Sequence, residues 1–361
     1  MTKKVFVGMS GGVDSSVTAA VLKQQGYDVT GVYMKNWSQD LPGMICPWKE
    51  DYQDAKRVAV QLGIPFKMYD FETEYRQKVV DYMVAEYQAG RTPNPDIMCN
   101  QEVKFKLFLQ AALDDGADMI ATGHYARVGN KELGIKNKVD SGAGALFAAA
   151  NAEKDQTYFL YRVTSEALSK SLMPIGEFAT KDEVRAKAQE FGLATADKKD
   201  SQGICFIGKV GIKDFLLHEL GPQPHGRIID TNGKDIGEHD GAIFYTIGQR
   251  HGLDVGGGLP YYVIGKDMAK NEVYVTTDLD DANLWHKERT ITDLHWINEA
   301  PAADKTYKIR TRYRSPLVKA IIDIAGDTAV VKLSQEIRAI TPGQSAVLYD
   351  GNRVIGGGIV I

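Results

Sequence analysis

The chain opens with KVFVGMSGGVDSS at residues 4–16, and this stretch decides the fold of its first half. A short apolar strand leads into a glycine pair, after which the apolar spacing of a helix begins at once with Val17 and Ala20. Glycines let a backbone come close to a ligand, and the unpaired N–H groups at a helix start attract anions. The stretch therefore predicts a strand, an anion-binding turn and a helix in direct succession.

The spacing of this turn separates it from two common phosphate loops. No Gly-Lys-Ser/Thr follows, as a Walker A loop requires, and G-x-G-x-x-G is absent. The turn resembles the S-G-G-x-D-S pyrophosphate loop of enzymes that split ATP into AMP and pyrophosphate. Serine hydroxyls donate to phosphate oxygens, and Asp14 is suited to position Mg²⁺ or a reacting group. The competing interpretation is a glycine-rich turn without a ligand, which the agreement of loop and flanks disfavours.

Size and composition are those of a water-soluble protein with two or three domains. The chain has 361 residues, of which 43% are hydrophobic and 25% charged. No apolar run reaches the roughly 18 residues of a membrane helix, and the start leads straight into a strand, so we expect a cytoplasmic protein. Three cysteines without C-x-x-C spacing and scattered histidines predict no metal site. A net charge of −4 leaves room for a local basic surface.

Strand and helix patterns alternate through the first half of the chain. After the opening strand come apolar strands at 28–34, 65–71 and 118–122, with helices at 52–62, 73–87 and 103–113. This rhythm predicts a doubly wound parallel sheet with helices on both faces. Ligands of such sheets bind beyond the carboxyl ends of the strands, which places Gly123 and His124 beside the glycine turn.

The second half changes character twice. Residues 129–152 are rich in Gly, Ala and Asn and predict a mobile connection, followed by helices at 156–162 and 180–191. Residues 226–241 are rich in turn signals, with strands expected at 242–247 and 261–264. Beyond about residue 287, short alternating strands predict a β-barrel. We therefore expect three domains: residues 1–207, residues 208–285 with mixed α/β structure, and residues 286–361.

Two cysteines lie in segments that indicate sulfur chemistry. Residues 91–100 contain two prolines, which predict a rigid loop without helix that holds Asp96 and Cys99 three residues apart. In residues 198–208, Cys205 follows a glycine, and two nearby lysines favour its thiolate. A proline turn with a buried cysteine is the alternative for the first segment. Beside an AMP-forming loop, the pair favours sulfur transfer.

Over essentially its whole length the chain resembles the bacterial tRNA-specific 2-thiouridylases of the MnmA type, within the ATP pyrophosphatase superfamily. The resemblance is weakest at residues 141–150. It implies an adenine nucleotide alpha hydrolase-like domain, a small mixed domain and a tRNA-binding barrel. The matching motifs are GMSGGVDSS (8–16), AGRTPNPDIMCNQEVKF (89–105), ATGHYAR (121–127), KDQTYFL (154–160), KKDSQGICFIG (198–208), GEHDGAIFYTIGQRHGL (237–253), RTRYR (310–314) and ITPGQSAVLY (340–349).

The resemblance also implies an activity. ATP, with Mg²⁺, adenylates the wobble uridine (position 34) of glutamate, glutamine and lysine tRNAs, and sulfur then replaces the oxygen on C2, releasing AMP and pyrophosphate. Cys205 would carry the sulfur as a persulfide, and Cys99 would be its partner nucleophile through a transient Cys99–Cys205 disulfide. Asp96 would be a general acid or base. A relay protein or a cysteine desulfurase would supply the sulfur to a monomeric enzyme.

Binding residues follow from the same motifs. Cys46 matches no motif, and we expect a structural or incidental role for it. The ATP contacts implied are Gly8, Met9, Ser10, Gly11, Gly12, Val13, Asp14, Ser15, Met34 and Gly123. The tRNA contacts implied are Asn94, Pro95, Asp96, His124, Lys154, Asp155, Gln156, Arg312, Tyr313 and Gln344.

The run KTYKIRTRYR at residues 305–314 carries five basic residues and no acidic one. On a strand, Lys308, Arg310, Arg312 and Arg314 would share one face and the aromatic residues the other. This pattern predicts a strip that follows tRNA phosphates, with Tyr313 available for base stacking. The alternative is a solvated edge strand whose charges oppose aggregation.

Two other function classes remain open on the residues alone. One is an AMP-forming ligase or amidotransferase of small molecules that shares the glycine loop. The other is a nucleotide-binding regulatory module without catalysis. Both leave the cysteine pair and the basic C-terminal run without a purpose.

Overall fold

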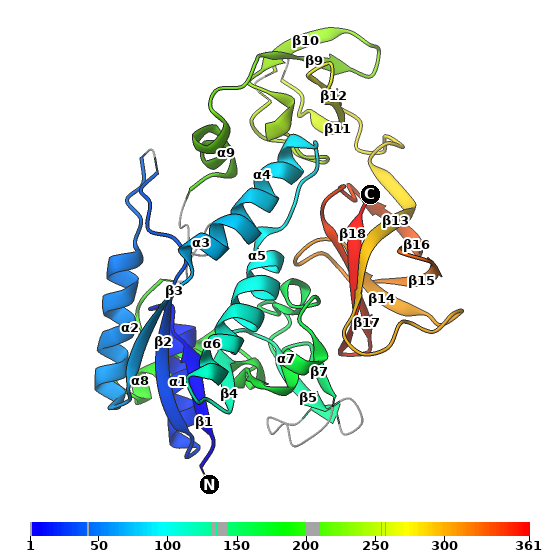
Figure 1. Cartoon of the computed structure of the whole chain (residues 1–361). Coiled ribbons are helices and arrows are strands. Elements are labelled where there is room, and N and C mark those ends of the chain that lie inside the picture. The colour runs from blue at the N-terminus through cyan, green and yellow to red at the C-terminus, as the bar shows by residue number, and fades with distance from the viewer. Residues whose placement is uncertain are drawn as a thin grey trace.

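A computed structural model describes residues 2–41, 43–130, 134–135, 143–199, 210–253, 255–256 and 258–361. Three sheets organise the chain, and each lies in a different part of the molecule (Figure 1). Cys205, with most of the segment around it, lies outside the described residues. Within the described part of the chain, no helix is long and apolar enough to cross a membrane.

The first sheet is parallel, with the strand order β3-β2-β1-β4-β8. Its central strands are almost fully buried, as expected for a sheet with helices on both faces. Helices α1 (Val13–Gln24), α2 (Trp48–Leu62) and α8 (Lys181–Glu190) lie to one side of it, and α6 (Phe108–Asp114) to the other (Figure 1). The predicted doubly wound sheet is confirmed. The strands are β1 (Lys4–Gly8), β2 (Asp28–Lys35), β3 (Phe66–Asp70), β4 (Met119–Thr122) and β8 (Ser171–Leu172).

The helical layer that carries Cys99 corrects one prediction. Two nearly continuous helical rods form, each with a π-helical segment: α3 (Glu72–Tyr75), Arg76–Val80 and α4 (Asp81–Gln88), then α5 (Pro95–Met98), Cys99–Leu107 and α6. The prediction of a helix-free loop at residues 91–100 is wrong from Pro95 onward. Pro95 occupies the first helical position, where its missing N–H would have no intrahelical acceptor in any case. Cys99 therefore stands on a helix.

The second sheet, of order β10-β9-β12-β11, follows helix α9 (Ile212–Leu220). Residues 226–241, expected to be mostly turns, contain the hairpin β9 (Gly226–Asp230) and β10 (Asp235–His239). The strand expected at 242–247 is instead a 3₁₀ turn, Ala242–Phe244, because a short apolar run is buried as well by one turn as by a strand. Strands β11 (Tyr262–Asp267) and β12 (Glu272–Thr276) complete the sheet.

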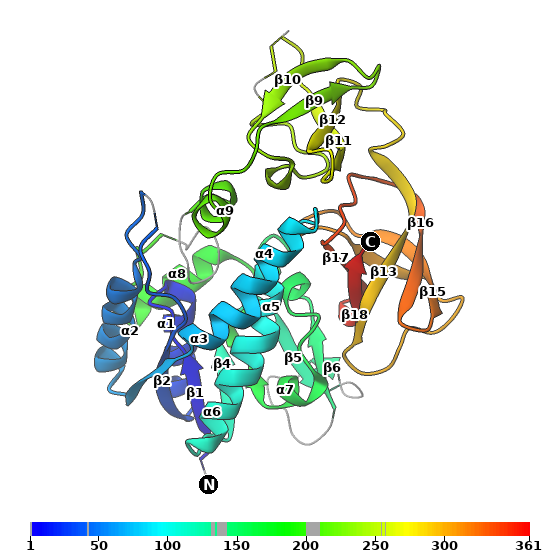
Figure 2. The same cartoon turned by 45° about the horizontal axis from the view of Figure 1, so that its top comes forward.

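The C-terminal strands close into the predicted barrel. The order is β13-β16-β15-β14-β17-β18, and a further pairing of β13 with β18 closes the ring (Figure 2). Closure removes the free sheet edges that would otherwise invite aggregation. The strands are β13 (Trp285–Trp296), β14 (Tyr307–Arg310), β15 (Val318–Ala325), β16 (Thr328–Arg338), β17 (Ser345–Asp350) and β18 (Arg353–Val360).

A part of the first domain extends the barrel sheet. Strand β7 (Gly144–Phe147) pairs with β18 through Leu146 and Val354, and β5 (Arg127–Asn130) pairs with β7 and with β6 (Gly134–Ile135). The prediction of a mobile connection over 129–152 is wrong at both ends, because the apolar run GALF buries its side chains in this sheet. Residues 131–133 and 136–142 lie outside the described residues. The helix expected at 156–162 is reduced to a 3₁₀ turn, Thr157–Phe159, followed by helix α7 (Ser165–Ser169).

Candidate nucleotide and thiol site

The glycine turn joins β1 to α1 in a conformation that presents backbone N–H groups. Gly11 has a φ of +75°, and a Cβ there would lie 2.4 Å from the carbonyl oxygen of Asp51. Gly12 begins α1 without a side-chain cap. The Ser15 hydroxyl accepts from the Ser10 amide at 3.1 Å and donates to the Gly12 carbonyl at 3.1 Å. An uncapped helix start framed in this way is suited to an anion.

Asp14 in the first turn of α1 is held by two side chains from distant parts of the chain. Lys181 Nζ donates to its Oδ1 at 2.7 Å, and the Tyr125 hydroxyl donates to the same oxygen at 3.0 Å. Lys181 comes from the start of α8 and also lies 5.6 Å from the ring centre of Tyr125. No sequence motif identifies Lys181, since a single lysine in a charged amphipathic helix is interpreted as a solvated residue. It places a cation beside the turn, which favours a bound phosphate.

Gly123 and Met34 pack directly against the turn and its strand. A Cβ on Gly123 would lie 2.7 Å from the Ser15 amide nitrogen, so only glycine permits this approach of β4 to α1. A Cβ on Gly8 would lie 2.9 Å from Cε of Met34, which lies on the neighbouring strand β2. The structure therefore brings the predicted loop, Met34 and Gly123 together at the carboxyl edge of the sheet. Met9 is buried, with its amide bonded to the Val32 carbonyl at 2.8 Å.

His124 is buried and neutral. Its Nδ1 lies 2.8 Å from the Thr122 hydroxyl, and its Nε2 lies 3.4 Å from Lys104 Nζ. Burial, and secondarily the charge of Lys104, holds the pKa of His124 well below its usual value. Because an ammonium group only donates, Nε2 is the acceptor and Nδ1–H donates to Thr122. The predicted tRNA contact is thus a largely enclosed side chain in this structure.

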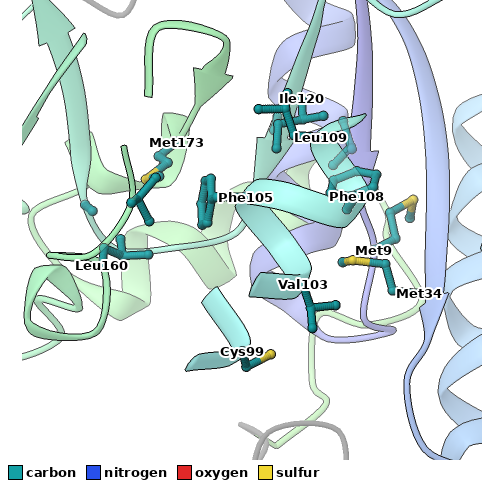
Figure 3. Packing of buried hydrophobic residues seen from close by; sticks show 14 of the residues in the cluster. Met9, Met34, Cys99, Val103, Phe105, Phe108, Leu109, Ile120, Leu160 and Met173 are labelled. Atoms are coloured by element: carbon teal, nitrogen blue, oxygen red, sulfur yellow. The ribbon is translucent and has the colours of Figure 1, made fainter. Parts of the chain in front are cut away.

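Cys99 lies at the boundary between α5 and the π-helical segment, and its side chain is fully buried. Figure 3 shows it beyond Val103 along the helix, on the side that faces Met34. One turn earlier, the Asp96 amide donates to the Asn94 side chain at 3.2 Å, so Asn94 caps the helix on which both Asp96 and Cys99 stand. Predicted loop residues thereby form a rigid helix start.

Of the other two cysteines, the structure describes Cys46 but not Cys205. Cys46 is a buried thiol that donates to the Trp37 carbonyl at 3.6 Å, and burial raises its pKa. The predicted persulfide carrier, Cys205, lies outside the described residues. Among the residues that the structure does describe, no three His, Cys, Asp or Glu side chains are grouped so that they could hold a metal ion.

A second missed residue is Asn36, directly after β2. It is 1% exposed, and among the residues that the structure describes neither its amide nitrogen nor its amide oxygen has a hydrogen-bond partner. Tyr33 and Lys35 lie on the face of β2 that meets Trp48 in α2. The alternation of side chains along a strand puts Asn36 on the opposite face, that of Met34. Sequence patterning cannot identify such a residue, because burial without hydrogen-bond partners is a property of the folded surroundings and not of the local sequence.

Several predicted tRNA contacts make contacts within the protein. Asp155 is 5% exposed and accepts from Thr157 Oγ1 at 2.9 Å and from Arg310 at 3.3 Å. Gln156 accepts from the Tyr125 amide at 2.8 Å. The amide of Lys154 donates to the Asn151 side chain at 3.2 Å. This motif therefore links the glycine-loop domain to the barrel.

The basic run does not form the predicted strip. Strand β14 ends at Arg310, and Arg314 has a φ of +61°, so the four basic residues do not share one strand face. Arg310 turns inward to Asp155, while Arg312 donates to the Ile247 carbonyl at 2.9 Å and to Thr341 Oγ1 at 2.7 Å. Tyr313 packs on Phe159, with ring centres 4.3 Å apart. Arg310 and Arg312 are therefore bonded to acceptors of other segments of the same chain.

The fold and the turn define an α/β nucleotide-binding protein of the pyrophosphate-loop class. Three protein families match in sequence: "tRNA methyl transferase HUP domain" at residues 3–209, "tRNA methyl transferase PRC-barrel domain" at 213–277 and "Aminomethyltransferase beta-barrel domain" at 286–360. The tRNA-specific 2-thiouridylase MnmA of Streptococcus sanguinis (strain SK36) is 47% identical over 365 residues, covering 99% of this chain and 95% of that protein. The enzyme of the same name from Streptococcus agalactiae (strain NEM316) is 47% identical over 363 residues with the same shares covered. The chain belongs to the MnmA family of tRNA-specific 2-thiouridylases.

Proposed function

We propose that this chain catalyses the ATP-dependent 2-thiolation of the wobble uridine of tRNA. The observation that carries the proposal is that a pyrophosphate-type turn packed against Met34 and a helix-borne Cys99 share one hydrophobic core in a member of this family. A small-molecule ligase would need the turn but not the thiol. A regulatory nucleotide-binding module would need neither Asp14 clamped by Lys181 nor a cysteine on a capped helix start.

The chemistry follows from the poor leaving ability of the oxygen on C2 of uracil. That oxygen attacks the α-phosphorus of ATP, pyrophosphate leaves, and C2 then carries AMP as a leaving group. The terminal sulfur of a Cys205 persulfide attacks C2 and expels AMP. The Cys99 thiolate attacks Sγ of Cys205, which forms the Cys99–Cys205 disulfide and leaves the sulfur on C2. An external dithiol reduces the disulfide by two electrons before the next cycle.

The turn suits ATP as the substrate. Its uncapped N–H groups would hold the departing pyrophosphate, and Lys181 would add positive charge beside it. A magnesium ion bound with the nucleotide would have Oδ2 of Asp14, because Oδ1 is engaged by Lys181 and Tyr125. Asp96, one helical turn before Cys99, would exchange the proton at the base. We assign the ATP and thiol chemistry to residues 1–207 and tRNA binding by the barrel to residues 286–361, with residues 208–285 as the mixed domain between them.

The partners are a tRNA with uridine at position 34, from the glutamate, glutamine or lysine acceptors, and a protein that donates persulfide sulfur. One competing activity is methylation, which the words "methyl transferase" in the matching family descriptions name. The two are separable by the product, since thiolation replaces an oxygen with sulfur and methylation adds carbon.

Nucleoside mass spectrometry of tRNA from a strain that lacks the gene tests this proposal. We expect 2-thiouridine derivatives to disappear and to return with the intact gene or with Cys46→Ser, whose thiol donates to the Trp37 backbone carbonyl. We expect no return with Cys99→Ser. Unchanged 2-thiouridine in the deletion strain, or loss of a methylated nucleoside instead, would contradict the proposal.

A further inference from the structure

We propose that Gln344 and Gly343 of the C-terminal barrel are positioning residues for Cys99, so that the barrel is part of the catalytic apparatus. The inference rests on the proposed role of Cys99 in sulfur transfer. It concerns how the thiol is held before any tRNA binds. The contacts around Thr92 support it.

The backbone of Thr92 is held from both sides by one barrel segment. Its amide donates to the Pro342 carbonyl at 2.9 Å, and its carbonyl accepts from the Gln344 side chain at 2.8 Å. The Thr92 hydroxyl also lies 3.1 Å from that of Thr246 in the middle domain. Segments from all three sheet-forming parts of the chain therefore meet at this one residue.

Gly343 makes the close approach of the two segments possible. Its φ is +90°, and a Cβ there would lie 2.7 Å from the Thr92 nitrogen and 2.9 Å from Cβ of Arg91. Any side chain at this position would push residues 91–92 away from the barrel. The backbone-to-backbone contact is thus specific to glycine.

The path from Thr92 to Cys99 is short and stiff. Pro93 and Pro95 have fixed φ angles, and Asn94 between them is fixed as the helix cap by its 3.2 Å bond to the Asp96 amide. On the other side, the Arg91 amide donates to the Glu86 carbonyl at 2.9 Å. A shift of Thr92 is therefore passed to the start of α5 and on to Cys99, because few torsions in between are free to absorb it.

The two roles of Gln344 predict different kinetics. A residue that only contacts tRNA would, when changed, raise the dissociation constant of tRNA and leave the rate at saturating tRNA intact. A residue that positions Cys99 would lower that saturating rate and leave the dissociation constant intact. It would also change how well the buried Cys99 thiol is protected when no substrate is present.

Gln344→Glu is the sharpest variant, because it replaces the donor to the Thr92 carbonyl with an acceptor of the same size. Gln335→Glu makes the same chemical change at an exposed position of β16 in the same barrel and is the matched control. Alkylation by iodoacetamide, without tRNA or ATP, is followed for each cysteine by peptide mass spectrometry, with Cys46 as the internal reference. In Gln344→Glu we expect alkylation of Cys99 to be about tenfold faster and the saturating single-turnover rate about tenfold lower. A factor of about ten corresponds to the loss of one hydrogen bond. Gln335→Glu should change neither.

Gly343→Ala gives an independent test. Its control is Gly351→Ala, where φ is +60° and an added Cβ has no atom of the described residues within 4 Å. Both variants carry backbone strain, but only the first disturbs Thr92. Unchanged alkylation of Cys99 in Gln344→Glu, together with a raised tRNA dissociation constant, would overturn the inference, as would equal effects of the two glycine variants. Because alkylation needs no thiolation activity, this result is independent of whether the proposed function holds.

Discussion

The glycine turn at residues 8–16 and the basic run at residues 305–314 both carry strong sequence signals, yet only the first has the structure that its signal predicts. In the turn, hydrogen bonds between residues a few positions apart set the backbone geometry, as from Ser15 to Gly12, whereas the distant residues Lys181 and Tyr125 bond to the Asp14 side chain. In the basic run, Arg310 and Arg312 find acceptors in Asp155 and Ile247, in other parts of the chain. Local partners are visible in a sequence, whereas distant ones are not.

The difference has a physical basis in desolvation. A helix start and a glycine pair impose their geometry through backbone sterics alone. A guanidinium group is buried only where hydrogen-bond acceptors or a buried carboxylate offset the free-energy cost of removing its water. Burial lowers the pKa of Arg312, because loss of water disfavours the charged guanidinium. Its charge is evident from the sequence, but its location is not.

The largest effect should come from the close approach that supports the turn. Gly123→Ala adds a Cβ that would lie 2.7 Å from the Ser15 amide nitrogen, which displaces the start of α1. A displacement of this kind at a reacting group costs about a hundredfold in rate. We expect tRNA-dependent release of pyrophosphate to fall by that factor. Gly265→Ala is the control, since an added Cβ there makes only an ordinary 3.6 Å contact; an equal loss in both variants would contradict the prediction.

A smaller effect should separate stability from tRNA binding in the basic run. Arg310→Ala removes the guanidinium group bonded to Asp155, and loss of this charge beside a buried carboxylate should lower the free energy of unfolding by about 2 kcal/mol. Lys308→Ala, at an exposed position of the same strand, should change it by less than about 0.5 kcal/mol. Urea unfolding measures both. If Arg310→Ala kept full stability and lowered the salt slope of tRNA binding by about one, Arg310 would be a phosphate contact after all.

The smallest predicted effect is the pH dependence that His124 introduces. Its pKa is lower in the folded protein than in the unfolded chain, so the unfolded state binds the additional proton as the pH falls. Stability should therefore decrease below the unfolded pKa of about 6.5, by up to about 1.4 kcal/mol per pH unit for this residue. Urea unfolding at neutral and mildly acidic pH, with His124→Gln and the exposed His225→Gln, tests it. An equal pH dependence in all three proteins would contradict the assignment.

The same contrast explains what the sequence reveals of the fold. Strand and helix periodicity predicts the parallel sheet, because each element buries its own apolar face. The helix at Pro95 was not predicted, since proline is read as a helix breaker unless its position at the helix start is known. The pairing of β7 with β18 joins residues about two hundred positions apart, and no local pattern encodes it.

At the site, the turn, Met34 and Gly123 come together as their motif positions predict, while Lys181, Asn36 and Thr92 carry no local signal. Lys181 acts through Asp14, and Thr92 through a barrel segment far along the chain. Each is recognisable only from the atoms that surround it.

The central claim is that the turn at residues 8–16 drives sulfur insertion by cleaving ATP to AMP and pyrophosphate. The most direct test mixes the purified chain, ATP, unmodified glutamate tRNA and a cysteine desulfurase with its substrate, and measures nucleotide products and 2-thiouridine in the same reaction. We predict equal amounts of AMP, pyrophosphate and 2-thiouridine. Release of ADP and phosphate in proportion to 2-thiouridine, or thiolation that proceeds without ATP, would contradict the claim.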